Sequence, residues 1–151
     1  MKVYIKSSPQ HGKGVFASLP IEQGEQVLVF TGPLLTRAEL NPRDYHLQIG
    51  ESSYLGPSGE ADDYVNHSCA PNTGFNDGLS LVTLRAIAPH EEITWDYSTA
   101  IDEEDFPGFP CRCGAPECRN TVRSFRHLDE KDQQRLAAYL LPYLKAKARG
   151  L

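Results

Sequence analysis

Four cysteines carry the most definite chemistry in this chain. Cys111, Cys113 and Cys118 lie within eight residues, and the fourth is Cys69. A Cys-x-Cys pair is poorly placed for a mutual disulfide, because its side chains lie too close along the chain for an unstrained bridge. A structural zinc site takes four ligands, usually thiolates, in a closed tetrahedral shell. Counting the cysteines together predicts a zinc site that joins Cys69 to the 111–118 segment; the alternative is three surface thiols and one buried thiol.

Such a zinc site is expected to be structural, since four thiolates leave no open position for water. It would fold the acidic connector 102–110 back over the stretch around Cys69. That stretch, residues 64–72, reads Tyr-Val-Asn-His-Ser-Cys-Ala-Pro-Asn. It has no apolar period, and Asn, Ser and Pro favour turns, so composition alone indicates a loop. Tied to zinc, this loop would form a site together with the C-terminal segment.

The bulk properties narrow the range of partners. A chain of 151 residues suffices for one domain with a core. The net charge of −5, from 15 basic and 20 acidic residues, argues against direct binding of nucleic acid or an anionic membrane and favours a basic protein segment. Neither a membrane-spanning apolar run nor a signal-peptide pattern is present in the sequence. We therefore expect a soluble, intracellular protein, cytoplasmic or, in a eukaryote, nuclear; the sequence predicts no oligomeric state.

The elements that position these residues are predicted to be short. Apolar runs alternate with Gly- and Pro-rich turns through the first hundred residues, which predicts a mainly β body. The expected strands cover residues 3–5, 15–17, 25–30, 45–49, 53–55, 79–87 and 92–97. Residues 34–44 form the one helix-like stretch of the first half. Near the C-terminus we expect a helix that packs on the body through one apolar face, with a kink at Pro142 and a solvated basic end at 145–149.

The sequence contains, in this order, Gly-Lys-Gly-Val-Phe-Ala at 12–17, Asn-His-Ser-Cys-Ala-Pro-Asn at 66–72, a segment ending in Asp-Tyr at 92–97, and the Cys-x-Cys-x4-Cys run at 111–118. These four motifs and their order resemble those of the SET-domain protein lysine methyltransferases. The resemblance implies a mainly β, β-clip fold of small curled sheets, with a pseudoknot made by the two signature segments. It implies a SET domain over 1–100, a post-SET zinc-binding segment over 101–126, and a C-terminal helix over 127–151.

The same resemblance implies an enzyme that moves a methyl group from S-adenosylmethionine to a lysine amine of a protein substrate, in a basic segment such as a histone-like or ribosomal tail. The zinc ligands would be Cys69 and the three cysteines of the post-SET motif. Tyr97 would be the catalytic tyrosine, with Tyr45 as a second tyrosine of the lysine channel and Tyr54 as its alternative. The cofactor would be bound by Lys13, Gly14, Val15, Tyr64, Asn66 and His67.

Some residues depart from the family pattern. Asp63 and Tyr64 stand where many members have Arg-Phe. Trp95 stands where many have Phe or Tyr, at a position linked in the family to the number of methyl groups added. The acidic stretches 60–63 and 102–105 either attract a basic substrate or form solvated faces. The alternative function is a non-catalytic SET-fold binding module with a structural zinc.

Overall fold

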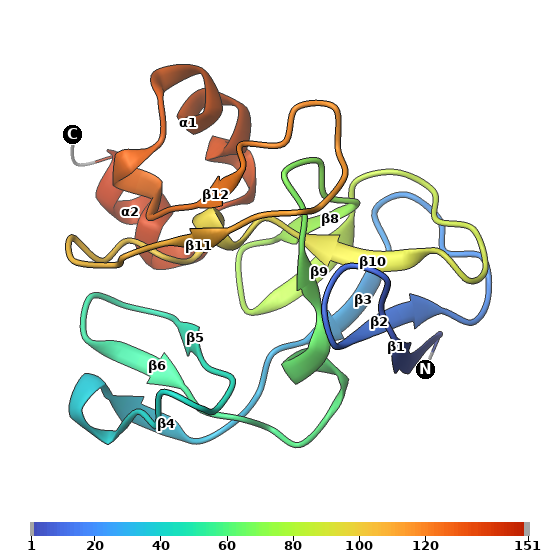
Figure 1. The fold of residues 1–151 in the computed structure, drawn as a ribbon, viewed down its shortest axis with the longest axis horizontal. Helices are drawn as coiled ribbons and strands as arrows, with labels where there is room; N and C mark the ends of the chain where they lie inside the picture. The colour runs from blue at the N-terminus through green and yellow to red at the C-terminus, as the bar shows by residue number, and fades with distance from the viewer. Residues whose placement is uncertain (1, 150–151) are drawn as a thin grey trace.

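The computed structural model describes residues 2–149, which form four small β-sheets and two short C-terminal α-helices (Figure 1). The largest sheet has the strand order β1-β2-β10-β7. Its strands are β1 (Val3–Ser7), β2 (Lys13–Ala17), β10 (Glu92–Trp95) and β7 (Asn66–His67). Two signature motifs, far apart in the sequence, are thus neighbouring strands: β10 pairs parallel with β7, placing Thr94 opposite Asn66 and Trp95 opposite His67.

Two three-stranded sheets accompany this one. The first has the order β3-β9-β8 and the second β4-β6-β5. Their strands are β3 (Gln26–Val29), β9 (Ser80–Thr83), β8 (Thr73–Phe75), β4 (Leu34–Thr36), β6 (Ser53–Leu55) and β5 (Leu47–Gln48). The helix-like stretch 34–44 is therefore a wrong prediction: it begins with β4, held by antiparallel pairing to β6, and only a short 3-10 turn (Arg37–Glu39) follows.

The core lies between the sheets. It is formed by aliphatic and aromatic residues that the turns of the first hundred residues fold inward, which is how short strands bury enough apolar surface to be stable. Its most deeply buried members are Val15, Ala17, Ile21, Phe75, Leu81, Ile87, Ile93, Ala100 and Leu141. The mainly β body that the sequence predicts is confirmed.

The C-terminal segment crosses over one end of this body. The strands β11 (Phe109–Pro110) and β12 (Thr121–Val122) pair antiparallel, and Figure 1 shows α1 above them and α2 beside them, both away from β4 and β6. The single helix expected here is divided into α1 (Glu130–Leu136) and α2 (Pro142–Arg149). Pro142 is the first residue of α2 rather than a kink, because proline lacks the N–H that a helix interior requires.

Both helices are held to the body by buried leucines and by backbone contacts. Leu136, Leu140 and Leu144 are buried, as the predicted apolar face requires. The Leu141 N–H donates to the Thr99 carbonyl over 3.0 Å. Within residues 2–149, neither helix is both long and apolar enough to cross a membrane.

Candidate active site and cysteine cluster

The cysteine cluster joins the loop after β7 to the segment between β11 and β12. The four sulfur atoms of Cys69, Cys111, Cys113 and Cys118 all lie within 4.8 Å of one another. The Sγ atoms of Cys69 and Cys111 are 3.8 Å apart. A zinc tetrahedron with sulfur at about 2.3 Å from the metal has edges of about 3.8 Å, so this donor set fits a structural zinc ion. Gly114, with φ of 75°, lets the chain turn between Cys113 and Cys118.

The surroundings of the sulfurs suit bound thiolates. The backbone N–H of Arg119 donates to Cys69 Sγ, and that of Asn120 donates to Cys118 Sγ, both over 3.4 Å. Burial raises the pKa of Cys69 to about 11, so this sulfur becomes a thiolate at neutral pH only with a cation beside it. A metal ion supplies that cation, and amide N–H donors of this kind then hold the ligands in place.

His67 lies between the cysteine cluster and Tyr97. Its Nδ1 accepts the backbone N–H of Tyr97 over 3.0 Å, and its Nε2 lies 3.4 Å from Cys69 Sγ. Burial lowers the pKa of His67 to about 4, so the ring is neutral near pH 7 and its 3.7 Å approach to Asp96 is not an ion pair. Because Nδ1 is an acceptor, the ring proton resides on Nε2 and points to the sulfur. The ring thereby connects a metal ligand to the backbone of the predicted catalytic tyrosine.

Asp96 and Arg119 form a buried ion pair beside the same cluster. The guanidinium Nη1 and Nη2 atoms each donate to the carboxylate over 2.8 Å. The Asp96 side chain is fully buried and that of Arg119 is 12% exposed. Asp96 also caps the 3-10 turn of Tyr97–Thr99 by accepting the N–H of Ser98. Sequence reasoning assigned no role to this pair, because the residues lie 23 positions apart and neither motif indicates the other.

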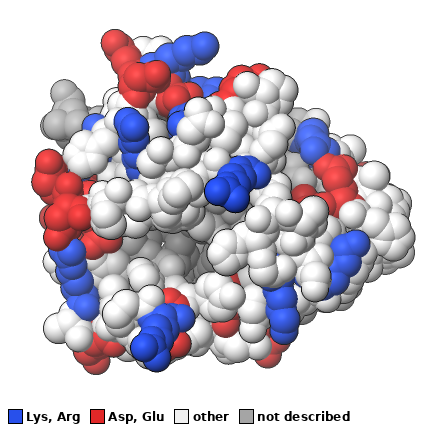
Figure 2. All heavy atoms as spheres, in the orientation of Figure 1, with Lys and Arg blue, Asp and Glu red and all other residues white. Residues whose placement is uncertain are grey.

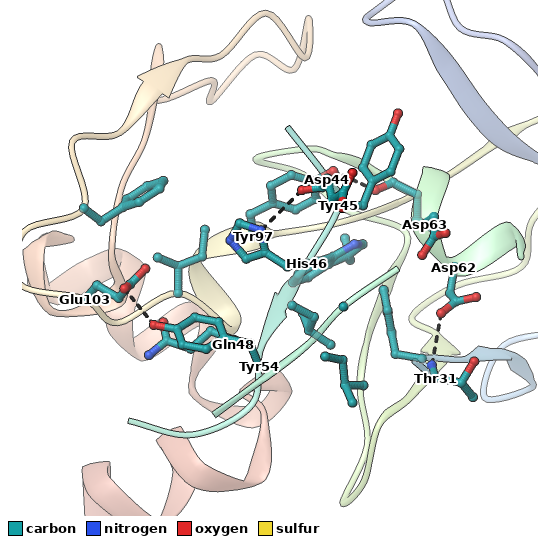
Figure 3. A pocket seen from close by; sticks show the side chains of 18 of the residues that line it. Thr31, Asp44, Tyr45, His46, Gln48, Tyr54, Asp62, Asp63, Tyr97 and Glu103 are labelled. Atoms are coloured by element: carbon teal, nitrogen blue, oxygen red, sulfur yellow. Dashed lines mark hydrogen bonds between the residues drawn. The ribbon is translucent and has the colours of Figure 1, made fainter. Parts of the chain in front are cut away.

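An apolar cavity of about 270 Å³ opens between β5, β6 and the segment after β10 (Figure 3). Trp95, Tyr97, Tyr45, Tyr54 and Phe109 are among the aromatic residues of its wall. The Tyr97 hydroxyl donates to the Val65 carbonyl over 2.7 Å. Burial, and to a smaller extent the neighbouring Tyr45 and Glu92, raise the pKa of Tyr97 well above its ordinary value, so the phenol stays protonated.

The two candidates for the second channel tyrosine have different surroundings in this wall. Tyr45 is 55% exposed and packs edge-on against Tyr64, with ring centroids 5.3 Å apart. Tyr54 is buried and its hydroxyl donates to Glu103 over 2.7 Å (Figure 3). Tyr45 is therefore free to meet an incoming side chain, whereas the hydroxyl of Tyr54 is engaged within the protein.

The remaining residues predicted to bind the cofactor meet at the start of β2. The Nδ2 atom of Asn66 donates to the Lys13 carbonyl over 3.0 Å and to Glu92 Oε1 over 2.8 Å. The Lys13 ammonium lies 5.6 Å from the centre of the Tyr64 ring. Val15 is fully buried in the core. The structure thus brings five of the six predicted residues to one place, namely Lys13, Gly14, Val15, Tyr64 and Asn66, with His67 next along β7.

The space beside the turn that leads into β2 is open. A Cβ built on Gly12, the residue that precedes β2, would meet no atom within 4 Å. Sequence reasoning missed Glu92, whose carboxylate contacts Asn66 from β10. The available signal was the position of this glutamate, at the start of an otherwise buried strand, because a glutamate that is partly buried usually has a partner.

Comparison with known proteins identifies the class. The SET-domain family model matches residues 12–98, more than half of the chain, and this chain belongs to the SET-domain family. Histone-lysine N-methyltransferase ash1 of Drosophila melanogaster is 31% identical over 130 residues, which cover 74% of this chain and 6% of the relative. Histone-lysine N-methyltransferase ATX2 of Arabidopsis thaliana is 30% identical over 134 residues, covering 74% of this chain and 12% of the relative. The chain therefore spans a small part of these relatives.

Solved structures agree on the fold. KRYPTONITE, in a complex with DNA, an H3(1-15) peptide and SAH, superposes with a TM-score of 0.65 at 24% identity, over 80% of this chain and 29% of that one. The methyltransferase domain of human SETMAR gives a TM-score of 0.67 at 21% identity, over 81% of this chain and 58% of that one. The SET-domain fold that the four motifs imply is confirmed.

Proposed function

We propose that this protein is an S-adenosylmethionine-dependent protein lysine N-methyltransferase with a structural zinc. The observation that carries the proposal is the position of Tyr97. Its protonated phenol lies in the wall of an apolar cavity, directly after the strand that pairs with Asn66 and His67. The names of the curated relatives, histone-lysine N-methyltransferases, and the SAH bound by KRYPTONITE support the same activity.

Tyr97 orients the nucleophile. Its proton is donated to the Val65 carbonyl, so the phenol oxygen can accept an N–H from a lysine amine and aim the nitrogen lone pair. The apolar wall disfavours the charged ammonium and lowers the pKa of the lysine, whose reference value is about 10.4. When bound, S-adenosylmethionine supplies the methyl group: the carbon–sulfur bond breaks, its electron pair goes to sulfur, and the new bond forms at the amine. The proton lost from the amine passes to solvent.

The residues at the start of β2 fit the methyl donor. The backbone of Lys13, Gly14 and Val15, with Tyr64, would hold its adenine and methionine ends, where the open space beside Gly12 leaves room. Asn66 and His67 would contact it from β7. Zinc, bound by the four cysteines, would keep the C-terminal segment against this site.

Tyr45 is the better candidate for the second channel tyrosine. It is exposed at the cavity and close enough to Tyr97 to affect the pKa of that phenol, whereas Tyr54 is bonded to Glu103. The carboxylate of Asp44 lines the same cavity, and its negative charge would favour a substrate segment rich in Lys or Arg. A location inside the cell, in the cytoplasm or the nucleus, suits such a substrate, because that environment keeps the cysteine thiols reduced.

The acidic stretches contribute less to substrate attraction than their composition indicates. Asp62 accepts hydrogen bonds from the Thr31 N–H and from the Ser58 hydroxyl. Figure 2 shows acidic and basic side chains side by side at the edge of a hollow on this face. In the 102–105 stretch the carboxylates pair with Arg37, Arg126 and Lys147. Asp44 is therefore the better candidate for attracting a basic substrate.

The test is methyl transfer from radiolabelled S-adenosylmethionine to a mixture of basic proteins. We expect labelling by the wild type and a loss of about 100-fold or more in Tyr97→Phe, since the orienting hydroxyl is removed. Tyr4→Phe is the matched control, because Tyr4 lies on β1 and its hydroxyl is bonded to His90. A wild type that binds the donor but labels no protein would favour the non-catalytic binding module. Undiminished labelling by Tyr97→Phe would reject the role of this tyrosine.

A further inference from the structure

The carboxylate of Glu92 lies at the point where the predicted cofactor residues converge. Its Oε1 accepts from Asn66 Nδ2 over 2.8 Å, and the Ser8 hydroxyl lies 2.9 and 3.0 Å from its two oxygens. Both donors are neutral. Throughout residues 2–149, no Lys, Arg or His side chain forms an ion pair with Glu92. The side chain is half-buried, and no cation of the described residues lies against its carboxylate.

Gly14 makes room for this carboxylate. An ideal Cβ on Gly14 would lie 2.3 Å from Glu92 Oε1 and 3.1 Å from Asn66 Nδ2, well inside contact distance. The missing side chain therefore leaves room beside β2 for the carboxylate of Glu92, on the central strand β10, to contact Asn66 on the neighbouring strand β7. Glycine at position 14 therefore makes room for the Glu92 carboxylate, and it also allows a ligand to approach the backbone closely.

The orientation of Asn66 depends on Glu92. The three groups around Asn66 Nδ2 are the carbonyls of His11 and Lys13 and the carboxylate of Glu92, all acceptors. An NH₂ group surrounded by acceptors fixes which way the amide faces. Glu92 is the charged member of this set, and a charge-assisted hydrogen bond is stronger than a neutral one.

The methyl donor has a charge that matches this site. S-adenosylmethionine carries a sulfonium, an α-ammonium and an α-carboxylate, so its net charge is positive, whereas 5′-methylthioadenosine shares its thioribosyl adenine and is neutral. Glu92 also acts on the predicted catalytic tyrosine, since its charge is one of the smaller contributions to the raised pKa of Tyr97.

We propose that Glu92 is a positioning residue of the methyl-donor site: its carboxylate orients Asn66 and supplies the negative charge that favours the cationic donor. This inference rests on the proposed function, because it assumes that the donor binds beside Gly14 and Asn66. It assigns a role to a residue outside the set predicted from the motifs.

The experiment compares Glu92→Gln with wild type, using titration calorimetry for S-adenosylmethionine and competition for 5′-methylthioadenosine. Glutamine can still accept from Asn66 while the charge is lost. We expect the Kd for S-adenosylmethionine to rise about tenfold and that for 5′-methylthioadenosine to change less than about twofold. Glu91→Gln is the matched control, because the adjacent carboxylate pairs with Arg85 at the surface. It should leave both Kd values unchanged.

Two results overturn the inference. Equal losses for both ligands would show that Glu92 acts only through hydrogen bonding, and unchanged binding of S-adenosylmethionine would show no role at all. A wild type that fails to bind S-adenosylmethionine overturns the proposed function instead. If Glu92→Gln does not fold, Glu92→Asp, which keeps the charge on a shorter side chain, must retain the preference for the cationic ligand, or the inference is wrong.

Discussion

Two buried carboxylates hold cations of the C-terminal third of the protein, and the two contacts differ in how exposed those cations are. The inner anchor is Arg119 with Asp96, beside the cysteine cluster and one residue before Tyr97. The outer anchor is Asp102 with Lys147 and Arg126. The cation of the inner anchor is 12% exposed, whereas Lys147 and Arg126 are 35% and 36% exposed. Burial raises the cost of breaking an ion pair, so the inner anchor is the one that can hold the site in place.

The inner anchor also connects directly to the metal ligands. The Arg119 N–H donates to Cys69 Sγ, while its side chain holds the aspartate that caps the turn containing Tyr97. The outer anchor makes no contact of this kind: it ties the 102–105 connector to α2 and to the turn at Arg126. Disturbing the inner anchor should therefore affect both folding and catalysis, and disturbing the outer one should affect folding slightly.

Loss of the metal should have the largest effect. In Cys111→Ser the closed four-sulfur shell is lost, and we expect zinc content to fall and methyl transfer to drop by more than about 100-fold, because folding of such a segment is coupled to metal binding. Cys111 is chosen because Cys69 also contacts His67. Native mass spectrometry reads the metal, and Arg112→Ala, an exposed neighbour, is the control. Retention of one zinc with unchanged affinity would contradict the four-cysteine site.

Breaking the inner anchor should have the next largest effect. Arg119→Met leaves the fully buried Asp96 without its cation, which should cost about 3–5 kcal/mol in the free energy of unfolding. Urea unfolding of the zinc-loaded protein measures it. The double variant Asp96→Asn with Arg119→Met removes the unpaired charge and should recover part of the loss. A single-variant loss below about 1 kcal/mol would show that the pair is not an anchor.

Breaking the outer anchor should have a small effect. Lys147→Met removes the 2.9 Å contact to Asp102, but the lysine is partly solvated and Arg126 still faces the same carboxylate. We expect a loss of about 0.5–1 kcal/mol, with methyl transfer unchanged. Arg135→Gln, which breaks a surface pair with Asp132 in α1, is the control for a purely local contact. A loss equal to that of Arg119→Met would remove the distinction between the anchors.

The two anchors also show how far sequence reasoning could go. Counting ligands paired Cys69 with the 111–118 segment, because metal chemistry fixes how many sulfurs must meet. The motifs indicated Asn66, His67 and Tyr97 as a group, and the structure brings them together on and directly after the paired strands β7 and β10.

Contacts between distant residues left no such signal. The basic end at 145–149 was expected to be solvated, yet Lys147 meets Asp102 across 45 residues. Likewise, Ser8 meets Glu92 across 84 residues, and the 34–44 stretch starts as a strand because β6 lies beside it. In each case a contact with a residue distant in the sequence decides the structure, and the local sequence preference does not.

The two anchors should also differ, by a smaller amount, in how strongly salt weakens them. Raising NaCl from about 0.05 to 0.5 M shortens the screening length from roughly 14 to 4 Å, which weakens ion pairs that water can reach. We expect the unfolding cost of Lys147→Met to shrink toward zero over this range, because 35% of that side chain is exposed. The cost of Arg119→Met should stay constant, since ions cannot enter between it and Asp96. Equal salt sensitivity in the two variants would mean that solvent reaches both pairs, and that zinc alone holds the C-terminal segment against the site.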